Sequence, residues 1–289
     1  MKKVVFASGK GGAGKTSIST AFFREFSKDS VMIDCDVDAS NCYITLDSRL
    51  NKSVPFYSGY KYSINKESCF NCGVCANVCQ FNAVKSINFQ YEINGFLCEG
   101  CGACVDACRM NAIGETSNYC GDLYDSKVFE DSGFFHARLF PGEDNSGKLI
   151  VELKSLALQY ANNTKAEMIV LDAPPGIGCP VIATLTGADV LVVVVEATNA
   201  GFSDARKLIE LVKDKKLKRY LIINKAGVDQ EIENEINDLV NNSNIEYLGS
   251  IPYKKDFYDL LNAKKFITDI ANNTISGDII RMFNVIAKI

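Results

Sequence analysis

The sequence contains no apolar run long enough to cross a membrane. Its longest strongly apolar stretch, Val190 to Val195, is far shorter than the roughly 20 residues that a membrane helix needs. The formal net charge of −4 gives no sign of a general nucleic-acid binder. The N-terminus, Met1-Lys2-Lys3, leads directly into an apolar segment and a glycine-rich motif that a cleaved signal peptide would destroy. We therefore expect a cytoplasmic protein with no membrane span and no nucleic-acid partner.

Histidine is also scarce, because His136 is the only one in the chain. A single histidine is more often structural than catalytic, so its role stays open at this point. Cysteine, in contrast, is abundant, with 12 in 289 residues. Disulfide scaffolds suit small secreted domains, and this chain is neither small nor predicted to be secreted. Metal binding is therefore the favoured use of the cysteines.

A glycine-rich motif lies between an apolar run at residues 4–7 and a helix-like run at 17–26. Its residues are Gly9-Lys10-Gly11-Gly12-Ala13-Gly14-Lys15-Thr16, with Ser17 following. Two glycines five apart before Lys-Thr, in a strand–loop–helix context, are typical of a phosphate-binding loop. Backbone N–H groups and the helix N-terminus would then bind phosphate. Lys15 would neutralise the β and γ phosphates, and Thr16 would hold Mg²⁺.

Carboxylates follow two further apolar strands. Asp34, Asp36 and Asp38 come at or after the end of residues 31–34, and Asp172 ends residues 168–172. Carboxylates at the C-terminal ends of parallel strands lie where open α/β sheets bind ligands, and they suit Mg²⁺ and the attacking water. Asp172 in particular fits the carboxylate that reaches the Mg²⁺ shell in nucleotide hydrolases.

The phosphate loop, with its second lysine, resembles the deviant loop of the MinD/ParA/Mrp ATPases and of the nitrogenase iron protein. The resemblance implies that Lys10 crosses a dimer interface to the partner's nucleotide, so that ATP holds two chains together. It also implies that Asp34 lies near Mg²⁺ and that Asp36 positions the attacking water. Lys10, Lys15, Asp36 and Asp172 are thus the predicted catalytic residues of an ATPase.

The nucleotide is predicted to be ATP or ADP. A guanine-reading loop of this type needs Asp where Gly227 stands, and its absence favours adenine. The family resemblance places Asn224 on the adenine base.

Eight of the cysteines form two identical runs of the pattern C-x₂-C-x₂-C-x₃-C, offset by 29 residues. This duplication has the spacing of a bacterial-type ferredoxin with two [4Fe–4S] clusters, in which the fourth cysteine of each run ligates the other cluster. The first cluster is then assigned to Cys69, Cys72, Cys75 and Cys108, and the second to Cys98, Cys101, Cys104 and Cys79. Zinc is the alternative, but its sites are usually built from more widely separated C-x₂-C pairs. Gln80 and Arg109 stand where ferredoxins usually have proline.

Apolar strands alternate with helical segments outside the cysteine-rich part. This predicts a doubly wound, mostly parallel α/β sheet of the P-loop NTPase type with an inserted small α+β ferredoxin domain. We predict ATPase segments at residues 1–58 and 117–289 and the insert at 59–116. Shorter expectations are strands at 128–129 and 137–140 and a helix from 145 to about 162 that Ser146 caps.

Three functions follow from these motifs. The first is an ATP-hydrolysing dimer, of two identical or two similar ATPase chains, that gates electron transfer through two [4Fe–4S] clusters to an unidentified partner protein. The second is a cluster carrier of the Mrp type with a cluster-acceptor partner, although the C-x-x-C that Mrp proteins carry near the C-terminus is missing, since no cysteine follows Cys179. The third is a MinD- or ParA-like spatial-organisation ATPase with structural clusters. Whether Cys179 or Cys120 binds a further shared cluster stays open.

Overall fold

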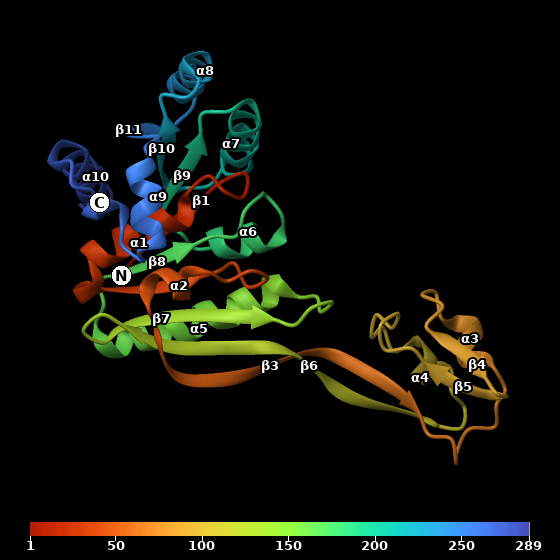
Figure 1. The fold of residues 1–289 in the computed structure, drawn as a ribbon. Helices are drawn as coiled ribbons and strands as arrows, with labels where there is room; N and C mark the ends of the chain where they lie inside the picture. Colours follow the sequence, from red (N-terminus) through yellow and green to blue (C-terminus); the bar gives the residue numbers. More distant parts are fainter. Residues whose placement is uncertain (289) are drawn as a thin grey trace. The chain divides into compact units, whose positions relative to one another are not determined.

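The structure, a computed structural model, describes residues 1–288, whose contacts form two compact units (Figure 1). The first unit comprises residues 1–54, 122–139 and the chain from 145 onward, and the second comprises 55–121 and 140–144. Two boundaries fall inside the 16-residue strands β3 (Arg49–Ile64) and β6 (Ile113–Val128). No helix within residues 1–288 is long and apolar enough to span a membrane.

A nine-stranded sheet has the order β11-β10-β9-β1-β8-β2-β7-β6-β3. In the first unit its strands run parallel from β11 to β7, as the alternating sequence pattern predicts. The strands of this parallel part are β1 (Lys2–Ala7), β2 (Ser30–Asp34), β7 (Ser132–Leu139), β8 (Met168–Asp172), β9 (Val190–Glu196), β10 (Lys218–Ala226) and β11 (Glu246–Pro252).

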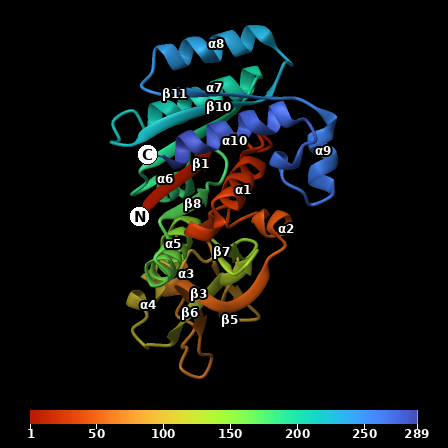
Figure 2. The same cartoon turned by 90° about the vertical axis from the view of Figure 1, so that its left-hand side faces the viewer.

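Helices cover both faces of this parallel sheet, which explains why its central strands β1, β8, β2 and β9 are mostly apolar and buried. Val4 and Phe6 of β1 pack in one core with Phe22 of α1 and Phe283 of α10. The opposite face contacts α5, α6 and α7 (Figures 1 and 2). The unit is therefore doubly wound, as predicted. Its helices are α1 (Lys15–Glu25), α2 (Cys42–Leu46), α5 (Ser146–Thr164), α6 (Cys179–Leu185), α7 (Asn199–Leu211), α8 (Gln230–Asn241), α9 (Lys255–Asn262) and α10 (Asn273–Ala287), with 3₁₀ turns at Ser27–Asp29 and Ile267–Asp269.

The second unit contains two matched halves. It holds α3 (Val74–Val78), α4 (Ala103–Ala107) and an antiparallel pair, β4 (Val84–Ile87) and β5 (Gln90–Ile93). Gly73 and Gly102 precede the two helices with φ of 76° and 78°, and their numbers differ by the 29-residue offset of the sequence repeat. The N–H of Asn65 donates to the carbonyl of Ala112 and that of Asn94 to Ala83, both at 2.7 Å, so each half closes on the other in the same way.

Two local expectations were wrong. Residues 128–129 do not form a separate short strand, because Val128 ends the long strand β6 and Phe129 turns the chain with a left-handed φ of 49°. Ser146 does not cap α5, because the preceding Asn145 occupies the cap position in a left-handed conformation with φ 78°. The short strand expected at 137–140 is the end of β7, which begins five residues earlier at Ser132.

Candidate functional site

The phosphate-loop motif connects β1 to the N-terminus of α1. Gly14 has φ 87°, and a Cβ there would lie 2.1 Å from Nδ2 of Asn224. A Cβ on Gly9 would lie 2.5 Å from the backbone carbonyl carbon of Asp204. Both positions therefore require glycine, the first for its conformation and both for space.

The three strands that carry the predicted polar residues are neighbours in the order β1-β8-β2. The loop follows β1, Asp172 ends β8 and Asp34 ends β2. In parallel strands these ends meet at one edge of the sheet, so residues far apart in the sequence converge there.

Asp172 is fully buried and accepts three strong hydrogen bonds. Lys15 Nζ and Thr16 Oγ1 each donate to Oδ2 at 2.7 Å, and Ser19 Oγ donates to Oδ1 at 2.8 Å. Burial alone would lower the pKa of Lys15, but the charge and hydrogen bond of Asp172 outweigh it, so the pKa is raised. Ser19 was missed by sequence reasoning, although it lies three residues after Thr16 and thus on the same side of α1.

Asp34 is also fully buried, and its carboxylate fixes the loop that follows it. It accepts from the backbone N–H groups of Asp36 at 3.0 Å, Asn41 at 3.0 Å and Cys42 at 3.1 Å, and from Ser40 Oγ at 2.8 Å. Burial and the charge of Asp172 raise the pKa of Asp34. The Asp34 carboxylate therefore also organises the loop that carries Asp36.

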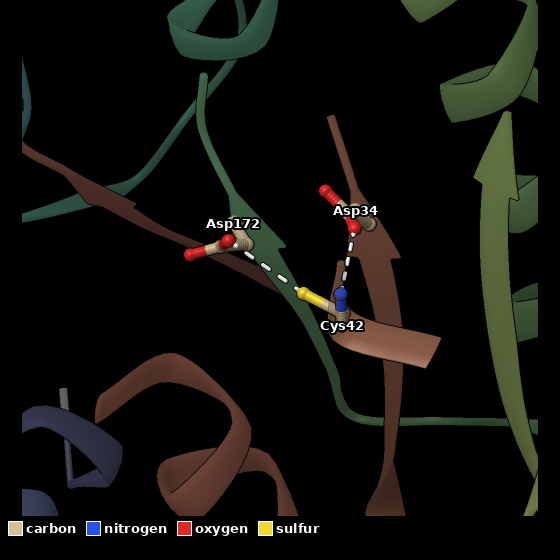
Figure 3. Close-up of side chains that lie close together, drawn as sticks. All are labelled: Asp34, Cys42 and Asp172. Atoms are coloured by element: carbon tan, nitrogen blue, oxygen red, sulfur yellow. Dashed lines mark hydrogen bonds between the residues drawn. The ribbon is translucent and has the colours of Figure 1, made fainter. Parts of the chain in front are cut away.

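Cys42 lies beside both carboxylates, a position that the sequence did not suggest. Its Sγ is 3.6 Å from Asp172 Oδ2, and one ligand atom from each of Asp34, Cys42 and Asp172 lies within 4.8 Å of the others (Figure 3). Burial and the two carboxylate charges raise the pKa of the Cys42 thiol well above 9.0, so it stays protonated at neutral pH.

The side chains of Thr16, Asp34 and Asp172 fit a magnesium site. Their donors are hydroxyl and carboxylate oxygens, which are the ligands that Mg²⁺ prefers. Thr16 and Asp172 are already in contact, and Asp34 lies beside Asp172. The third ligand type in the group, the Cys42 thiol, is not one that Mg²⁺ selects.

Asp36 is partly exposed at the rim of the same site. It accepts a hydrogen bond of 3.3 Å from the N–H of Ala39, and burial raises the pKa of its carboxyl. Asp36 lines a cleft of about 760 Å³ together with the phosphate loop. It therefore lines the same cleft as Lys15, and the charges of Lys15 and Asp172 both act on its carboxyl.

The same cleft has a wall with apolar and aromatic side chains. This wall contains Asn224 of β10, Pro252 at the end of β11, and Phe257 and Tyr258 of α9. Asn224 Nδ2 donates to the carbonyl of Ala13 at 2.8 Å, which ties this wall to the phosphate loop. The volume is within the range of small-molecule sites, which are mostly apolar with a few polar groups.

Lys10 is turned toward its own chain. Its Nζ lies 3.0 Å from Glu196 Oε2 and 3.2 Å from Thr198 Oγ1. Lys225 binds the other oxygen of Glu196 at 3.2 Å and donates to the carbonyl of Gly12 at 2.9 Å. The structure thus separates Lys10 from the group formed by Lys15, Thr16 and Asp172.

The eight repeated cysteines of the second unit line two separate cavities. One is lined by Cys69, Cys72, Cys75 and Cys108, and the other by Cys98, Cys101, Cys104 and Cys79. These are the two sets named from the sequence spacing. Every residue that lines one cavity has its counterpart, at the 29-residue offset, in the other. Four counterpart pairs differ in residue type, namely Phe70/Glu99, Val74/Ala103, Met110/Phe81 and Ile113/Val84.

The chemistry of these cavities fits [4Fe–4S] clusters. The N–H of Ala83 donates to Cys79 Sγ and that of Ala112 to Cys108 Sγ, both at 3.3 Å. Burial raises the pKa of Cys79, but backbone donors led by Ala83 outweigh it and lower it, which favours the thiolate that iron binds. Among the described residues, those lining the cavities include no lysine, arginine or histidine.

The remaining candidates lie outside both sites or at their edges. His136 stacks on Phe134 and Tyr124, with ring centroids 4.8 Å apart in each pair, which is a structural role. Cys120 is buried and donates to the carbonyl of Ser58 at 3.2 Å. Cys179 is exposed at the first position of α6.

The geometry on β1, β8 and β2 agrees with the comparisons to known proteins. A family profile described as "CobQ/CobB/MinD/ParA nucleotide binding domain" matches residues 4–267. The chain belongs to this family. It is 36% identical to the uncharacterized protein MJ0578 of Methanocaldococcus jannaschii over 287 residues, covering 97% of this chain and 95% of that protein. It is 28% identical to MJ0579 of the same organism over 297 residues, covering 96% and 99%.

The fold is similar to that of the septum site-determining protein MinD from Pyrococcus horikoshii, solved in complex with Mg-ADP. The TM-score is 0.59 at 12% identity, with 99% of this chain and 96% of that chain covered. At this identity the likeness concerns the fold. The expected α/β P-loop fold and membership of the MinD/ParA group are therefore confirmed.

Proposed function

We propose that this protein is an ATP-hydrolysing switch whose second unit carries two [4Fe–4S] clusters, and that the nucleotide state controls electron transfer through them. The ATPase part is supported by the family and by the buried contact of Lys15 and Thr16 with Asp172 below the cleft. The iron–sulfur part is carried by one observation, which is that each of two cavities is lined by four cysteines in a matched arrangement.

The residues of the cleft account for hydrolysis in a few steps. ATP enters along the loop, and Lys15 exchanges the Asp172 carboxylate for the β and γ phosphates, because its ammonium lies at the N-terminus of α1 where phosphate binds. Asp172 and Thr16, released from Lys15, would hold Mg²⁺, which neutralises charge on the phosphates. Asp36, at the rim of the cleft, orients the attacking water.

The second unit supplies the electron carrier. Each cavity offers four cysteine sulfurs, and a [4Fe–4S] cluster bound there would store one electron at a time. The residues that line the two cavities include no cationic side chain, and backbone N–H groups donate to Cys79 and Cys108. The chain also buries Cys75 and Cys104, which are 9% and 8% exposed. Closed sites of four cysteines hold clusters tightly, which argues against the carrier function.

A dimer is part of the proposal. ATP would bring two identical or similar chains together, with Lys10 leaving Glu196 to reach the partner's nucleotide. The electron acceptor or donor is a separate protein whose identity the geometry does not define.

A redox titration tests the coupling directly. Protein purified and reconstituted without oxygen is titrated and followed by EPR, with and without Mg-ATP. We expect eight iron atoms per chain and cluster potentials that shift with ATP. The variant Lys15→Ala is the control, since it retains all eight cysteines but should lose the shift. Cluster potentials that are the same with and without Mg-ATP would contradict the proposed coupling.

The comparisons favour a second candidate, a MinD- or ParA-like ATPase that organises other molecules in the cell, with clusters that only stabilise the second unit. The similarity to a septum site-determining MinD carries this alternative. In that case ATP should still bind and drive dimerisation, iron should still be present, and the cluster potentials should be the same with and without Mg-ATP.

A further inference from the structure

The two cysteine cavities differ in charge, although they match closely in other respects. This comparison rests on the proposed function, because it concerns clusters bound by these cysteines. Cluster potentials respond to hydrogen bonds to sulfur, to solvent exposure and to nearby charge. Each of these three influences can be compared across the 29-residue offset.

Backbone hydrogen bonds to the fourth cysteine of each run are the same in both cavities. The N–H of Ala83 donates to Cys79 Sγ and that of Ala112 donates to Cys108 Sγ, both at 3.3 Å. Each of these two cysteines lines the cavity whose other three cysteines come from the other copy of the repeat. In the first cavity the Cys69 thiol also donates to Asn71 Oδ1 at 3.8 Å, but this bond needs the thiol proton, which is lost when the sulfur binds iron. A glycine with φ of 76° or 78° precedes the helix beside each cavity. This influence therefore does not separate the two clusters.

Solvent exposure is also closely matched. Cys75 is 9% exposed and its counterpart Cys104 is 8% exposed. The remaining cysteines agree in the same way, since Cys72 and Cys101 are both exposed and the other members of the two sets are partly buried. Exposure of the ligands therefore does not separate the clusters either.

Charge is different. Of the four counterpart pairs that differ, three exchange one apolar side chain for another, and only Phe70/Glu99 exchanges an apolar ring for a carboxylate. Each of these two residues directly follows the first cysteine of its run. A second difference also makes the second cavity more negative than the first. Arg109 follows Cys108 of the first cavity, whereas uncharged Gln80 follows Cys79 of the second.

Apart from Glu99 and Arg109, this unit carries three lysines and six carboxylates, and one of these carboxylates, Glu67, lies two residues before Cys69 of the first run. Two of the lysines are in ion pairs, since Lys66 Nζ lies 2.7 Å from Glu92 Oε1 and Lys61 Nζ lies 2.9 Å from Glu143 Oε1. Glu115 lies near Tyr62, which lines the second cavity. Burial, together with the charge of Glu115, raises the pKa of Tyr62. Among the residues that line the two cavities Glu99 is the only charged one, so the lining of the second cavity is the more negative of the two.

We propose that Glu99 sets an order between the two clusters, so that the one held by Cys98, Cys101, Cys104 and Cys79 has the more negative potential and the one beside Phe70 is reduced first. Reduction adds one electron from a one-electron donor and makes or breaks no bond. A carboxylate beside the cluster disfavours the added negative charge, and because Glu99 is exposed, water and salt weaken this effect. An electron entering the unit therefore rests in the first cavity.

The test is an EPR-monitored redox titration of the reconstituted full chain with dithionite and viologen mediators, run alongside an iron and sulfide count. The wild type should give two one-electron steps at different potentials. Glu99→Gln removes only the charge and should raise the more negative potential while leaving the other in place. Phe70→Glu, compared with Phe70→Gln as its uncharged match, should lower the higher potential.

The inference is overturned if Glu99→Gln moves neither potential, or moves the higher one. In either case an intact count of eight iron atoms would leave the proposed function standing. If the chain instead binds zinc or no iron, the proposed function itself has failed, and the order of the clusters fails with it.

Discussion

The ammonium of Lys10 lies 3.0 Å from the carboxylate of Glu196 in the same chain. Burial raises the pKa of Glu196, but the hydrogen bonds from Lys10 and Lys225 outweigh it, so that its pKa is lowered. A lysine that is to reach a partner's nucleotide must first leave this contact. In the proposed dimer, this ion pair would therefore oppose dimerisation of the chain without nucleotide.

Replacing Glu196 with Gln should make ATP-dependent dimerisation easier, because Lys10 loses its charged partner and is freer to move. Both side chains are partly exposed, so the gain should be modest, about 0.5 to 1 kcal/mol or roughly a two- to fivefold tighter dimer. Light scattering at increasing ATP concentrations measures it. Lys10→Ala should instead suppress the dimer while leaving monomer nucleotide affinity largely in place.

Glu210→Gln is the matched control, since it removes a carboxylate from the ion pair of Glu210 with Lys213, away from the cleft. Its dimerisation should equal that of the wild type. A Glu196→Gln dimer no tighter than this control would show that the contact does not hold Lys10 back.

Lys15→Met should abolish ATP hydrolysis and also destabilise the nucleotide-free chain. The substitution leaves the Asp172 carboxylate buried without its cation, and breaking a buried ion pair typically costs about 3–5 kcal/mol. Thr16 and Ser19 still donate to Asp172, so the loss should be near the lower value. Urea unfolding followed by circular dichroism measures the stability, and phosphate release measures the hydrolysis.

The double variant Lys15→Met with Asp172→Asn separates the two effects. Because the unpaired charge is gone, most of the stability should return, while hydrolysis stays absent. The free energy of unfolding that the double variant loses is compared with the sum of the losses in Lys15→Met and Asp172→Asn. If the two are equal, the two side chains do not stabilise the fold as a pair.

Chemical labelling should distinguish the buried Cys35 and Cys42 from the exposed Cys179. Burial raises the pKa of Cys35 to about 12 and that of Cys42 well above 9.0, so neither is a thiolate at neutral pH. In the native reconstituted protein at pH 7, iodoacetamide should label Cys179 and leave Cys35 and Cys42 unmodified, as mass spectrometry of peptides would show. In urea all three should react. Rapid labelling of Cys42 in the native state would contradict its buried position beside Asp172.

Acid should destabilise the fold partly through His136. Burial lowers its pKa from 6.5 to about 4. Between these values the unfolded chain binds a proton that the folded chain does not, so the free energy of unfolding falls as pH drops from about 6.5 to about 4. At about 1.4 kcal/mol per pH unit over this window, the loss should reach at most about 3.5 kcal/mol.

His136→Phe keeps an aromatic ring for stacking on Phe134 and Tyr124 and has no group to protonate. Its stability should therefore depend less on pH across this window than that of the wild type, measured by urea unfolding at pH 7, 6 and 5. Equal pH dependence in both chains would mean that His136 is not the group responsible.

From the sequence one could expect Lys15, Thr16 and Asp172 to lie together, because these residues are next to strand ends, and the structure has them in contact. Lys15, Thr16 and Asp172 each stand at a junction that the apolar pattern marks, and parallel strands bring such junctions together. Ser19 and Cys42 were missed because they contact Asp172 only through the packing of α1 and α2, which spacing does not reveal. The contact of Lys10 with Glu196 of the same chain depends on how the end of β9 lies beside the phosphate loop, which residue spacing also does not reveal.

The architecture of the parallel sheet was also accessible from sequence, since strands buried on both faces are apolar throughout. The long strands β3 and β6 were not, because they mix polar, aromatic and apolar residues without a clear period, and the expected insert began and ended inside them. The ligand assignment of the eight cysteines and the limits of the insert stay predictions until metal analysis tests them.

The last cysteine of each cavity comes from the other copy of the repeat, Cys108 for one and Cys79 for the other. Deleting either copy would therefore leave three cysteines at one cavity and a single one at the other. The two halves depend on each other for every complete ligand set, so a shortened chain with one repeat should bind no intact cluster at all.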